Sequence, residues 1–262
     1  MILISAVTHW FWRSGCTRRR TALSKKVRAG HGMADIVTDF AGDDVAPIST
    51  GEQVYERIRT DIVFGRLRPG QRLPLEKLRT AYGVGIGTLR EIFSRLTPEG
   101  LVTAEGQRGF QVAPCSAEDL KEIAALRLLI ERSALAQSFQ SGDMEWEGRV
   151  VAAHHKLARM EASLLAGDRT QAEQWKRYDW EFHQALVSAC GSKALLNVHS
   201  GVYDRYLRYQ MVFVIFRGSV AAEEHKALLG CALRRDAAEA QAILEQHIQG
   251  CLDFAFHNRL IT

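Results

Sequence analysis

The feature that most constrains this 262-residue chain is a run of helical and strand patterns between residues 54 and 113. Apolar residues recur at helical spacing in three stretches, and a glycine or a proline ends each of them. The stretches begin at Val54, Leu75 and Leu89 and end before Gly65, Gly83 and Pro98. A short turn separates the second helix from the third, which is the layout of a helix-turn-helix. The pattern therefore predicts a helix that enters the major groove of DNA.

Two short strand patterns follow these helices. Residues 101–103 and 110–112 are predicted to pair as a small hairpin, and the glycines of the intervening Glu105-Gly106-Gln107-Arg108-Gly109 supply its turn. Arg108 at the tip offers a cation to a phosphate or to the minor groove. The alternative is a small helical subdomain that binds no nucleic acid. Residues 49–114 hold ten Lys/Arg against seven Asp/Glu, so the order of the elements, rather than charge, favours DNA binding.

This segment resembles the winged helix-turn-helix of the GntR family of bacterial transcription regulators. The matching stretches keep the family's order and spacing: LRPGQRL at 67–73, GVGIGTLREIFSRLTPEGLV at 83–102 and GQRGFQVA at 106–113. One departure concerns the start of the recognition helix, where the family usually has a Ser-Arg-Thr-Pro-like run. Here that run is Gly85-Ile86-Gly87-Thr88, so an isoleucine replaces the arginine, and operator sequences of better-known members are not expected to apply.

The resemblance implies which side chains contact DNA. Thr88 and Arg90 are expected in the major groove, and Arg108 at the wing. Arg79 and Arg95 are further expected DNA contacts.

Length and composition predict two folded domains in the cytoplasm. No apolar run approaches the roughly 20 residues that a membrane helix needs. The five cysteines are scattered and form no CxxC pair, which suits a reducing compartment and argues against a disulfide framework or a zinc knuckle. The expected parts are a tail at 1–48, a DNA-binding domain at 49–114 and an all-helical domain at 115–262.

The net charge of +4 originates in the N-terminal tail. Residues 1–33 hold seven Lys/Arg and no Asp or Glu, which leaves 27 basic and 30 acidic residues in the rest of the chain. We expect residues 1–32 to be upstream sequence before a true start at Met33; the alternative is a disordered basic arm that binds DNA. Residues 34–48 are acidic and are expected to be a flexible lead-in, with Ser49 or Thr50 capping the first helix.

After Pro114 the chain shows helical patterns without a strand signal. Helix-start patterns occur at Ser116 with Asp119, at Asp168 with Gln171 and at Asp236 with Glu239. The breaks predict about six helices in an antiparallel bundle; they fall at Ser141-Gly142-Asp143, Gly167-Asp168, Gly191-Ser192, Arg217-Gly218-Ser219 and Arg235-Asp236. The fold class is therefore mainly α: an N-terminal winged helix-turn-helix and a C-terminal all-α antiparallel helical bundle.

Four polar side chains fall on apolar faces of this bundle. Asp179 and His183 lie one turn apart on one helix, while His225 and His247 occupy apolar faces of the last two. Each residue taken singly is more often a core or surface group than a ligand. Burying all four without partners is unfavourable, and one divalent cation satisfies them together. Imidazole and carboxylate ligands suit zinc, nickel, manganese or iron.

The bundle is similar to the FCD ligand-binding domain of the FadR-like branch of the same family. The matching stretches are LRLLIE at 126–131, DWEFHQALVSACGSKAL at 179–195, EEHKALL at 223–229 and QHI at 246–248. The resemblance implies that Asp179, His183, His225 and His247 hold a divalent metal ion, which we expect to be zinc, with nickel or manganese possible. Gly191-Ser192 replaces the family's usual Gly-Asn.

Arg127 is a charge within an otherwise apolar helical stretch. It either pairs with Glu131 on a solvated face or points inward, where its guanidinium would bind an effector carboxylate. An arginine at this place in similar proteins favours the second interpretation. Arg205 is a second expected effector contact, and Tyr206 and Arg208 are further candidates for lining the cavity. The other histidines after residue 115 are expected to be at the surface or incidental: His154, His155, His199 and His257.

Together these patterns predict a homodimeric transcription regulator that binds a pseudo-palindromic DNA operator. A small organic acid bound at the metal would control operator affinity through the linker near Ala113-Pro114-Cys115. A metalloenzyme using the Asp/His centre is less favoured, because the spacing supplies no further acid or base and the DNA-binding half would be unexplained. A regulator that senses the metal itself, or uses it only structurally, is the remaining alternative.

Overall fold

The computed structural model describes residues 50–213 and 216–261, and two hydrophobic clusters organise them. The expectations for the tail at 1–48 and for a cap at Ser49 lie outside these residues. In the described part no helix is both long enough and apolar enough to span a lipid bilayer.

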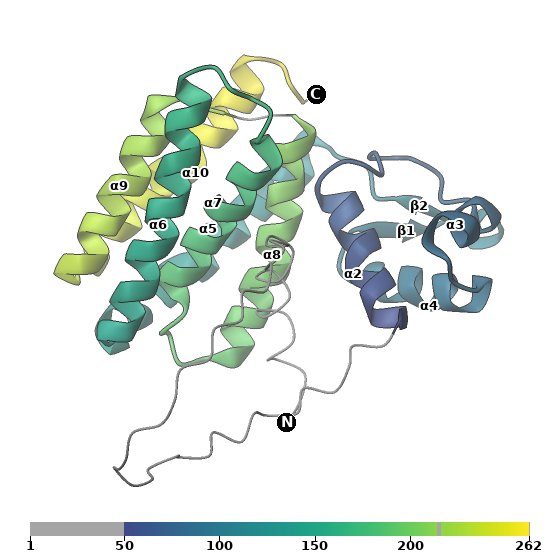
Figure 1. Cartoon of the computed structure of the whole chain (residues 1–262), viewed down its shortest axis with the longest axis horizontal. Coiled ribbons are helices and arrows are strands. Elements are labelled where there is room, and N and C mark those ends of the chain that lie inside the picture. The colour runs from purple at the N-terminus through teal and green to yellow at the C-terminus, as the bar shows by residue number, and fades with distance from the viewer. Residues whose placement is uncertain (1–49, 214–215, 262) are drawn as a thin grey trace, which may run out of the picture. The chain divides into compact units, whose positions relative to one another are not determined.

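The first cluster belongs to the predicted winged helix-turn-helix, and the prediction of three helices and a hairpin is confirmed (Figure 1). Its elements are α2 (Thr50–Val63), α3 (Leu75–Tyr82), α4 (Ile86–Leu96), β1 (Val102–Ala104) and β2 (Phe110–Val112). The cluster is built around Ile58, Ile62, Leu89, Phe93 and Leu96, which are all fully buried. This domain therefore has an apolar interior distinct from that of the bundle.

Local chemistry fixes the turns of this domain. Gly83 ends α3 with a φ of 70°, a left-handed conformation that glycine adopts without a steric penalty. The strands β1 and β2 pair antiparallel, with Val102 opposite Val112. The single turn of 3-10 helix η1 (Gly106–Arg108) forms the wing tip, which Gly109 closes with a φ of 90°. The hairpin begins one residue later than predicted.

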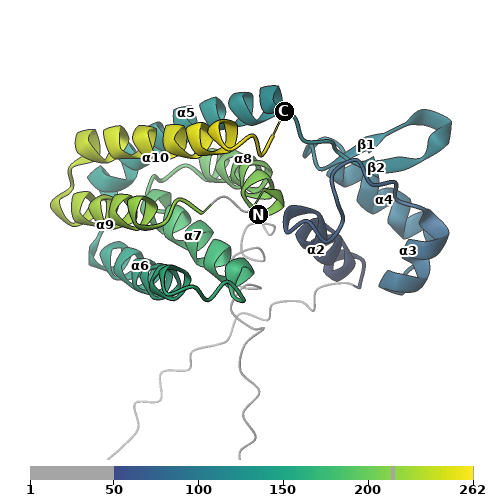
Figure 2. The same cartoon turned by 90° about the horizontal axis from the view of Figure 1, so that it is seen from above.

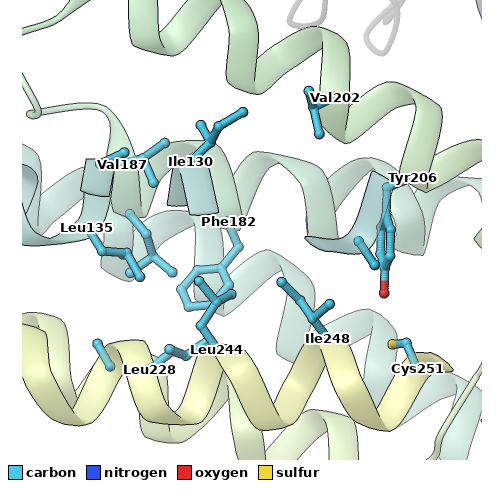
Figure 3. Close-up of a cluster of buried hydrophobic side chains, with 14 of the residues drawn as sticks. Ile130, Leu135, Phe182, Val187, Val202, Tyr206, Leu228, Leu244, Ile248 and Cys251 are labelled. Atoms are coloured by element: carbon cyan, nitrogen blue, oxygen red, sulfur yellow. The ribbon is translucent and has the colours of Figure 1, made fainter. Parts of the chain in front are cut away.

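The second cluster fills a bundle of six helices, as predicted (Figure 2). The helices are α5 (Ala117–Ser141), α6 (Met144–Leu165), α7 (Ala172–Val187), α8 (Lys193–Val212), α9 (Ser219–Arg234) and α10 (Ala237–His257). Helix α5 packs against α7, α8 and α10, whereas α9 packs against α6 and α10. Phe182 of α7 lies in this core with Leu228 and Leu244, and the Tyr206 hydroxyl points toward Cys251 (Figure 3).

Two of the three predicted helix starts in the bundle are confirmed. Ser116 and Asp236 accept hydrogen bonds from the backbone N–H groups of Asp119 and Glu239. The prediction for Asp168 is wrong, because α7 begins at Ala172 after Gln171. The Asp168 carboxylate instead accepts from the backbone and hydroxyl of Thr170, two residues on, and so closes a local turn.

Helix α8 contributes to both clusters. Val202, Tyr206 and Tyr209 belong to the bundle core, whereas the buried side chains of Tyr203 and Leu207 pack with the winged domain. Successive helical residues point in directions about 100° apart, so neighbouring positions of one helix reach the two cores. The predicted domain boundary at residues 114 and 115 stays a prediction, but α8 links the cores on either side of it.

Candidate functional site

Asp179, His183, His225 and His247 converge inside the bundle. All four side chains are buried, with at most 3% of any residue exposed. One ring nitrogen from each histidine lies within 4.8 Å of those of the other two. His225 Nε2 is 3.3 Å from Asp179 Oδ1. The structure thus brings together residues from α7, α9 and α10 that the sequence predicted to form one centre.

The apolar pattern of each helix explains this convergence. On α7, Asp179 and His183 share the inward face with Trp175, Phe182 and Leu186. His225 lies between the buried Ala221 and Leu228 on α9, and His247 follows Leu244 on α10. Because the surrounding apolar residues must face the core, the helices carry their polar groups inward as well.

An outer layer of charged side chains orients two of the imidazoles. His225 Nδ1 lies 2.6 Å from Glu161 Oε1, and His247 Nδ1 lies 2.7 Å from Glu224 Oε2. A carboxylate only accepts hydrogen bonds, so His225 Nδ1 donates to Glu161 and leaves Nε2 facing the centre. His247 Nδ1 faces two groups, the acceptor Glu224 and the donor Arg217 Nη2 at 3.0 Å, and it donates to Glu224 in the tautomer whose Nε2 has a free lone pair. That tautomer is the one in which Nε2 can bind a cation.

His183 has a different neighbour at Nδ1. Arg127 Nη2 lies 3.1 Å from this nitrogen, and because a guanidinium only donates, Nδ1 accepts in this contact. Glu131 Oε2 lies 3.8 Å from the same nitrogen. Cation binding by His183 Nε2 would require Nδ1 to donate, so Glu131 would have to become the partner of Nδ1 in place of Arg127.

Three buried atoms of these four residues lack a hydrogen-bond partner: Asp179 Oδ1, His183 Nε2 and His225 Nε2. The other oxygen of Asp179, Oδ2, accepts from the Tyr203 hydroxyl at 2.9 Å and from Lys176 Nζ at 3.3 Å. Unpaired buried polar atoms are unfavourable, and here they converge on one place. One carboxylate and three imidazoles form a donor set that fits a divalent transition metal.

The surroundings of the centre shift the pKa values of its aspartate and of two of its histidines. Burial alone would raise the pKa of Asp179, but Lys176 and His225 lower it below its usual range. Burial lowers the pKa of His183, reinforced by Arg127, and burial lowers that of His247 to about 4. At neutral pH the aspartate is therefore ionised and these two imidazoles are neutral, which are the states that bind metal.

Arg127 combines the two alternatives that its sequence context left open. Its Nε donates to Glu131 Oε1 at 2.9 Å, so the pair within α5 forms, but both side chains are buried rather than solvated. The guanidinium lies over the rings of Tyr203 and Tyr206, at 4.4 and 4.6 Å from their centroids. Its Nη1 has no hydrogen-bond partner. Arg127 thus belongs to the centre, with one free donor edge.

The expectation that His199 is superficial or incidental is wrong. His199 is fully buried, and its Nε2 lies 2.7 Å from Glu131 Oε1 while Gln184 faces its Nδ1 at 3.0 Å. His155 and His257 are exposed, as expected, but His154 is half-buried with its ring 5.3 Å from that of Phe182. His199 therefore holds the carboxylate that pairs with Arg127.

Arg205 does not join the centre. Its Nη2 donates to Asp119 Oδ1 at 2.7 Å, and its side chain lies against Gly100 of the winged domain. Position 205 points away from the bundle core because Tyr206, the next residue, occupies the inward position. Arg208 is buried, but its guanidinium donates to the carbonyl oxygen of Ala113 in the linker.

The expected DNA contacts lie on the winged domain with different partners. Arg90 on α4 and Arg108 at the wing tip are exposed, and Thr88 is half-buried near the start of α4. Arg79 is exposed and pairs with Glu76 at 3.2 Å. Arg95 binds Glu52 at 2.8 Å and lies 3.9 Å over the ring of Tyr55. Arg95 is thus the expected contact that is most engaged within the domain itself.

Several functional neighbours of the centre were not foreseen from the sequence, notably Glu161, Lys176, Tyr203 and Glu224. Glu224 directly precedes His225, and Lys176 precedes Asp179 by one turn, so both are close in sequence to a predicted ligand. Glu161 lies on α6, which carries none of the four residues. Only the packing of α6 against α9 identifies it.

Comparison with known proteins identifies both parts of the chain. Residues 50–112 match the family described as bacterial regulatory proteins, gntR family, and residues 122–250 match the FCD domain. The chain is 38% identical to BphR of Paraburkholderia xenovorans (strain LB400), an uncharacterized HTH-type transcriptional regulator; the match covers 81% of this chain and 89% of BphR. It is 31% identical to the HTH-type transcriptional repressor GlaR of Escherichia coli (strain K12), covering 74% of this chain and 90% of GlaR.

Solved structures agree on the fold. E. coli McbR/YncC superposes with a TM-score of 0.70 at 19% identity, over 81% of this chain and all of that one. A putative GntR transcriptional regulator from Rhodococcus sp. RHA1 gives 0.66 at 23% identity, over 79% of this chain and 97% of that one. The two family models and the two similar regulators show that the chain is a member of the GntR family in its FadR-like branch: a DNA-binding transcriptional regulator with a C-terminal FCD domain, and not an enzyme.

Proposed function

We propose that this regulator binds its DNA operator as a homodimer, and that a small carboxylate held beside a divalent cation in the bundle controls operator affinity. As a DNA-binding regulator it would act in the cytoplasm. The observation that carries the proposal is the convergence of Asp179 Oδ1, His183 Nε2 and His225 Nε2, all buried and without partners. A cation at this place would satisfy them together, and His247 would complete the set. We expect zinc, with nickel or manganese as substitutes.

The charges around the centre support an anionic effector. Three cationic side chains contact the four residues: Arg127, Lys176 and Arg217. Four carboxylates oppose them, those of Asp179, Glu131, Glu161 and Glu224. A divalent cation would turn this small negative balance into a positive one, which favours an anion nearby. Arg127 Nη1 is a donor without a partner and could bind one oxygen of a carboxylate.

The winged domain supplies the DNA-binding surface. In this proposal Thr88 and Arg90 read base edges in the major groove, and Arg108 meets a phosphate or the minor groove. Arg79 and Arg95 contribute less, because Glu76 and Glu52 already pair with them. Winged regulators that read two half-sites do so as symmetric dimers. Exposed apolar side chains on the outer face of α5, such as Leu129 at 69%, are compatible with such a contact.

The second candidate function is a regulator that responds to the metal alone. The same three unpaired atoms favour it, because they require only a cation. The two possibilities differ in Arg127, which has a role toward a ligand only if an organic anion binds. Arg205 supports neither possibility, since it binds Asp119 away from the centre.

A thermal-shift experiment on the full chain separates these possibilities. The protein would be tested against a panel of small mono- and dicarboxylates, with a chelator and after zinc is restored. A ligand that binds only the folded state raises the melting temperature by mass action. A carboxylate whose stabilisation disappears with the chelator supports the proposal. Stabilisation by zinc without any carboxylate effect favours metal sensing, and no shift with zinc contradicts both.

The DNA assignment needs its own test. After the operator is selected from a randomised DNA pool, binding by Arg90→Ala is compared with that by Lys77→Ala, an exposed lysine on α3. Loss of one bidentate base contact is expected to weaken binding by about 1–3 kcal/mol and to relax the preference at one base position. Unchanged affinity and sequence preference for Arg90→Ala would count against Arg90 as a base-reading residue.

A further inference from the structure

Helix α8 connects the candidate metal centre to the DNA-binding domain through two adjacent residues, Tyr203 and Asp204. Tyr203 belongs to the hydrophobic cluster that surrounds α2, yet its hydroxyl donates to Asp179 Oδ2 at 2.9 Å. Asp204, the next residue, accepts a hydrogen bond from Arg59 of α2. One turn of helix therefore touches both regions.

Tyr203 is enclosed by the groups of the centre. Its ring lies 4.4 Å from the Arg127 guanidinium and 5.5 Å from the ring of His183. The residue is fully buried, so its hydroxyl has no water to replace Asp179 as a partner. A displacement of the Asp179 carboxylate must therefore be followed by Tyr203, or the buried hydroxyl loses its acceptor.

Asp204 faces the winged domain. Only 7% of it is exposed, and it shares Arg59 with Glu99, whose Oε2 lies 3.1 Å from Arg59 Nε. Glu99 follows the C-terminal end of α4, the helix that carries Arg90. Arg59 thus joins α8, α2 and a residue that follows the recognition helix in one ion-pair network. Asp204 is the member of this network that belongs to the bundle.

We propose that Tyr203 and Asp204 couple occupancy of the metal centre to the docking of α2 against α8. This inference rests on the proposed function. Asp179 Oδ1 lacks a partner, so a ligand for Oδ1 restrains the carboxylate and, through Oδ2, the Tyr203 hydroxyl. Because Tyr203 and Asp204 are consecutive residues of α8, restraining Tyr203 raises the population in which Asp204 pairs with Arg59. The docked arrangement of α2 becomes more populated, and the two binding sites share a free energy of coupling.

Hydrogen exchange of the α2 amides in the full chain tests this coupling without knowledge of the operator. Exchange over residues 50–63 is measured with a chelator and with saturating zinc, and the bound zinc per chain is measured in parallel. Zinc is expected to slow α2 exchange in the wild-type chain by at least about fivefold. Tyr203→Phe keeps the buried ring but lacks the hydroxyl, and Asp204→Asn keeps the shape but lacks the charge. At saturating zinc both should reach the zinc stoichiometry of the wild-type chain, even if Tyr203→Phe binds zinc more weakly, yet show less than about a twofold change in α2.

Glu173→Gln is the matched control. Glu173 also bridges to the winged domain, through Arg66 at 2.7 Å, but its side chain is 42% exposed and it pairs with Arg66 and Arg177 rather than with the residues of the centre. This variant should keep the full wild-type response. Zinc binding with an unchanged α2 in the wild type, or a full response in both Tyr203→Phe and Asp204→Asn, would overturn the coupling and leave the metal centre intact. A wild-type chain that binds no zinc would overturn the metal centre, and the coupling with it.

Discussion

The winged domain and the helical bundle differ in what they bury. Within the described residues, every buried polar or charged side chain lies between α5 and α10, among them Arg127, Asp179 and His225. The buried side chains of α2, α3, α4 and the hairpin are apolar, apart from the hydroxyl of Tyr55, which donates to Glu99. One domain thus keeps its charges at the surface, whereas the other places charges inside its core.

This difference agrees with the ligand proposed for each domain. DNA is a large polyanion that is contacted from outside, so exposed cations on a rigid apolar frame are sufficient. A small ligand is recognised from within, and recognition then requires buried polar atoms whose partner is the ligand. In the bundle the unpaired buried atoms include ionisable groups, at Asp179 and His225, whereas in the described winged domain the unpaired buried side-chain atom is the Thr103 hydroxyl oxygen.

The largest expected effect is in the apolar frame of the winged domain. Ile58→Ala removes a fully buried side chain and should destabilise the domain by about 2–5 kcal/mol. Lys77→Ala on the exposed face of α3 should change stability by less than about 0.5 kcal/mol. Urea unfolding followed by hydrogen exchange in α4 measures both. Equal changes in the free energy of unfolding for the two substitutions would contradict the comparison of the domains, because the buried apolar side chains would then not be what stabilises the winged domain.

The bundle should be most sensitive at its buried carboxylates. Glu161→Gln weakens the acceptor at His225 Nδ1 and is expected to lower zinc affinity by about 10–100-fold. Glu181→Gln is the control, since Glu181 pairs with Lys156 at the surface at 2.5 Å. Competition with a chelator gives both affinities. If Glu181→Gln lowered zinc affinity as much as Glu161→Gln, burial would not be what distinguishes the two carboxylates.

The same difference explains which features the sequence predicts well. The winged domain is organised by local patterns, so apolar spacing together with Gly83 and Pro98 identifies its helices. Asp179, His183, His225 and His247 could be predicted because each polar side chain interrupts an apolar face. Charged and polar side chains rarely occupy the buried face of an amphipathic helix, so an exception can be recognised from the sequence alone.

Residues that support the centre from other helices could not be predicted in the same way. Glu161 and His199 lie on α6 and α8, and only the tertiary packing brings them to His225 and Glu131. Arg205 shows the opposite failure: its spacing along α8 is compatible with an inward position, but Tyr206 occupies that position and Arg205 reaches Asp119 instead. The direction of a side chain depends on neighbouring helices that the sequence does not order.

Acidification should weaken the bundle through its buried neutral imidazoles. Burial lowers the pKa of His247 from 6.5 to about 4, so between these values the unfolded chain binds a proton that the folded chain does not. This contribution to stability is complete above pH 6.5 and is lost as the pH falls toward 4. In the chelated protein, lowering the pH from about 7 to about 5.5 should remove about 1 kcal/mol for this imidazole.

Urea midpoints followed by tryptophan emission measure this loss, because the described tryptophans lie in α6 and α7. His247→Asn should reduce the dependence of the midpoint on pH, whereas His257→Asn at an exposed position should leave it unchanged. Residues 49–153 include no histidine, so histidine protonation in the winged domain cannot contribute to the pH dependence of the free energy of unfolding. Equal pH dependence in the two variants would contradict the assignment to His247.

The smallest expected effect separates two arginines of the recognition helix. Arg95 binds both oxygens of Glu52, at 2.8 and 3.1 Å, and its side chain is 42% exposed. An exposed ion pair contributes about 0–1 kcal/mol, so Arg95→Ala should change the free energy of unfolding by no more than this. Its effect on operator binding should also be below the roughly 1–3 kcal/mol expected for Arg90→Ala. Fluorescence anisotropy with the selected operator measures both variants. Equal losses of operator affinity in the two variants would mean that Arg95 leaves Glu52 to bind DNA. The ion pairs on the surface of the winged domain would then break when DNA binds.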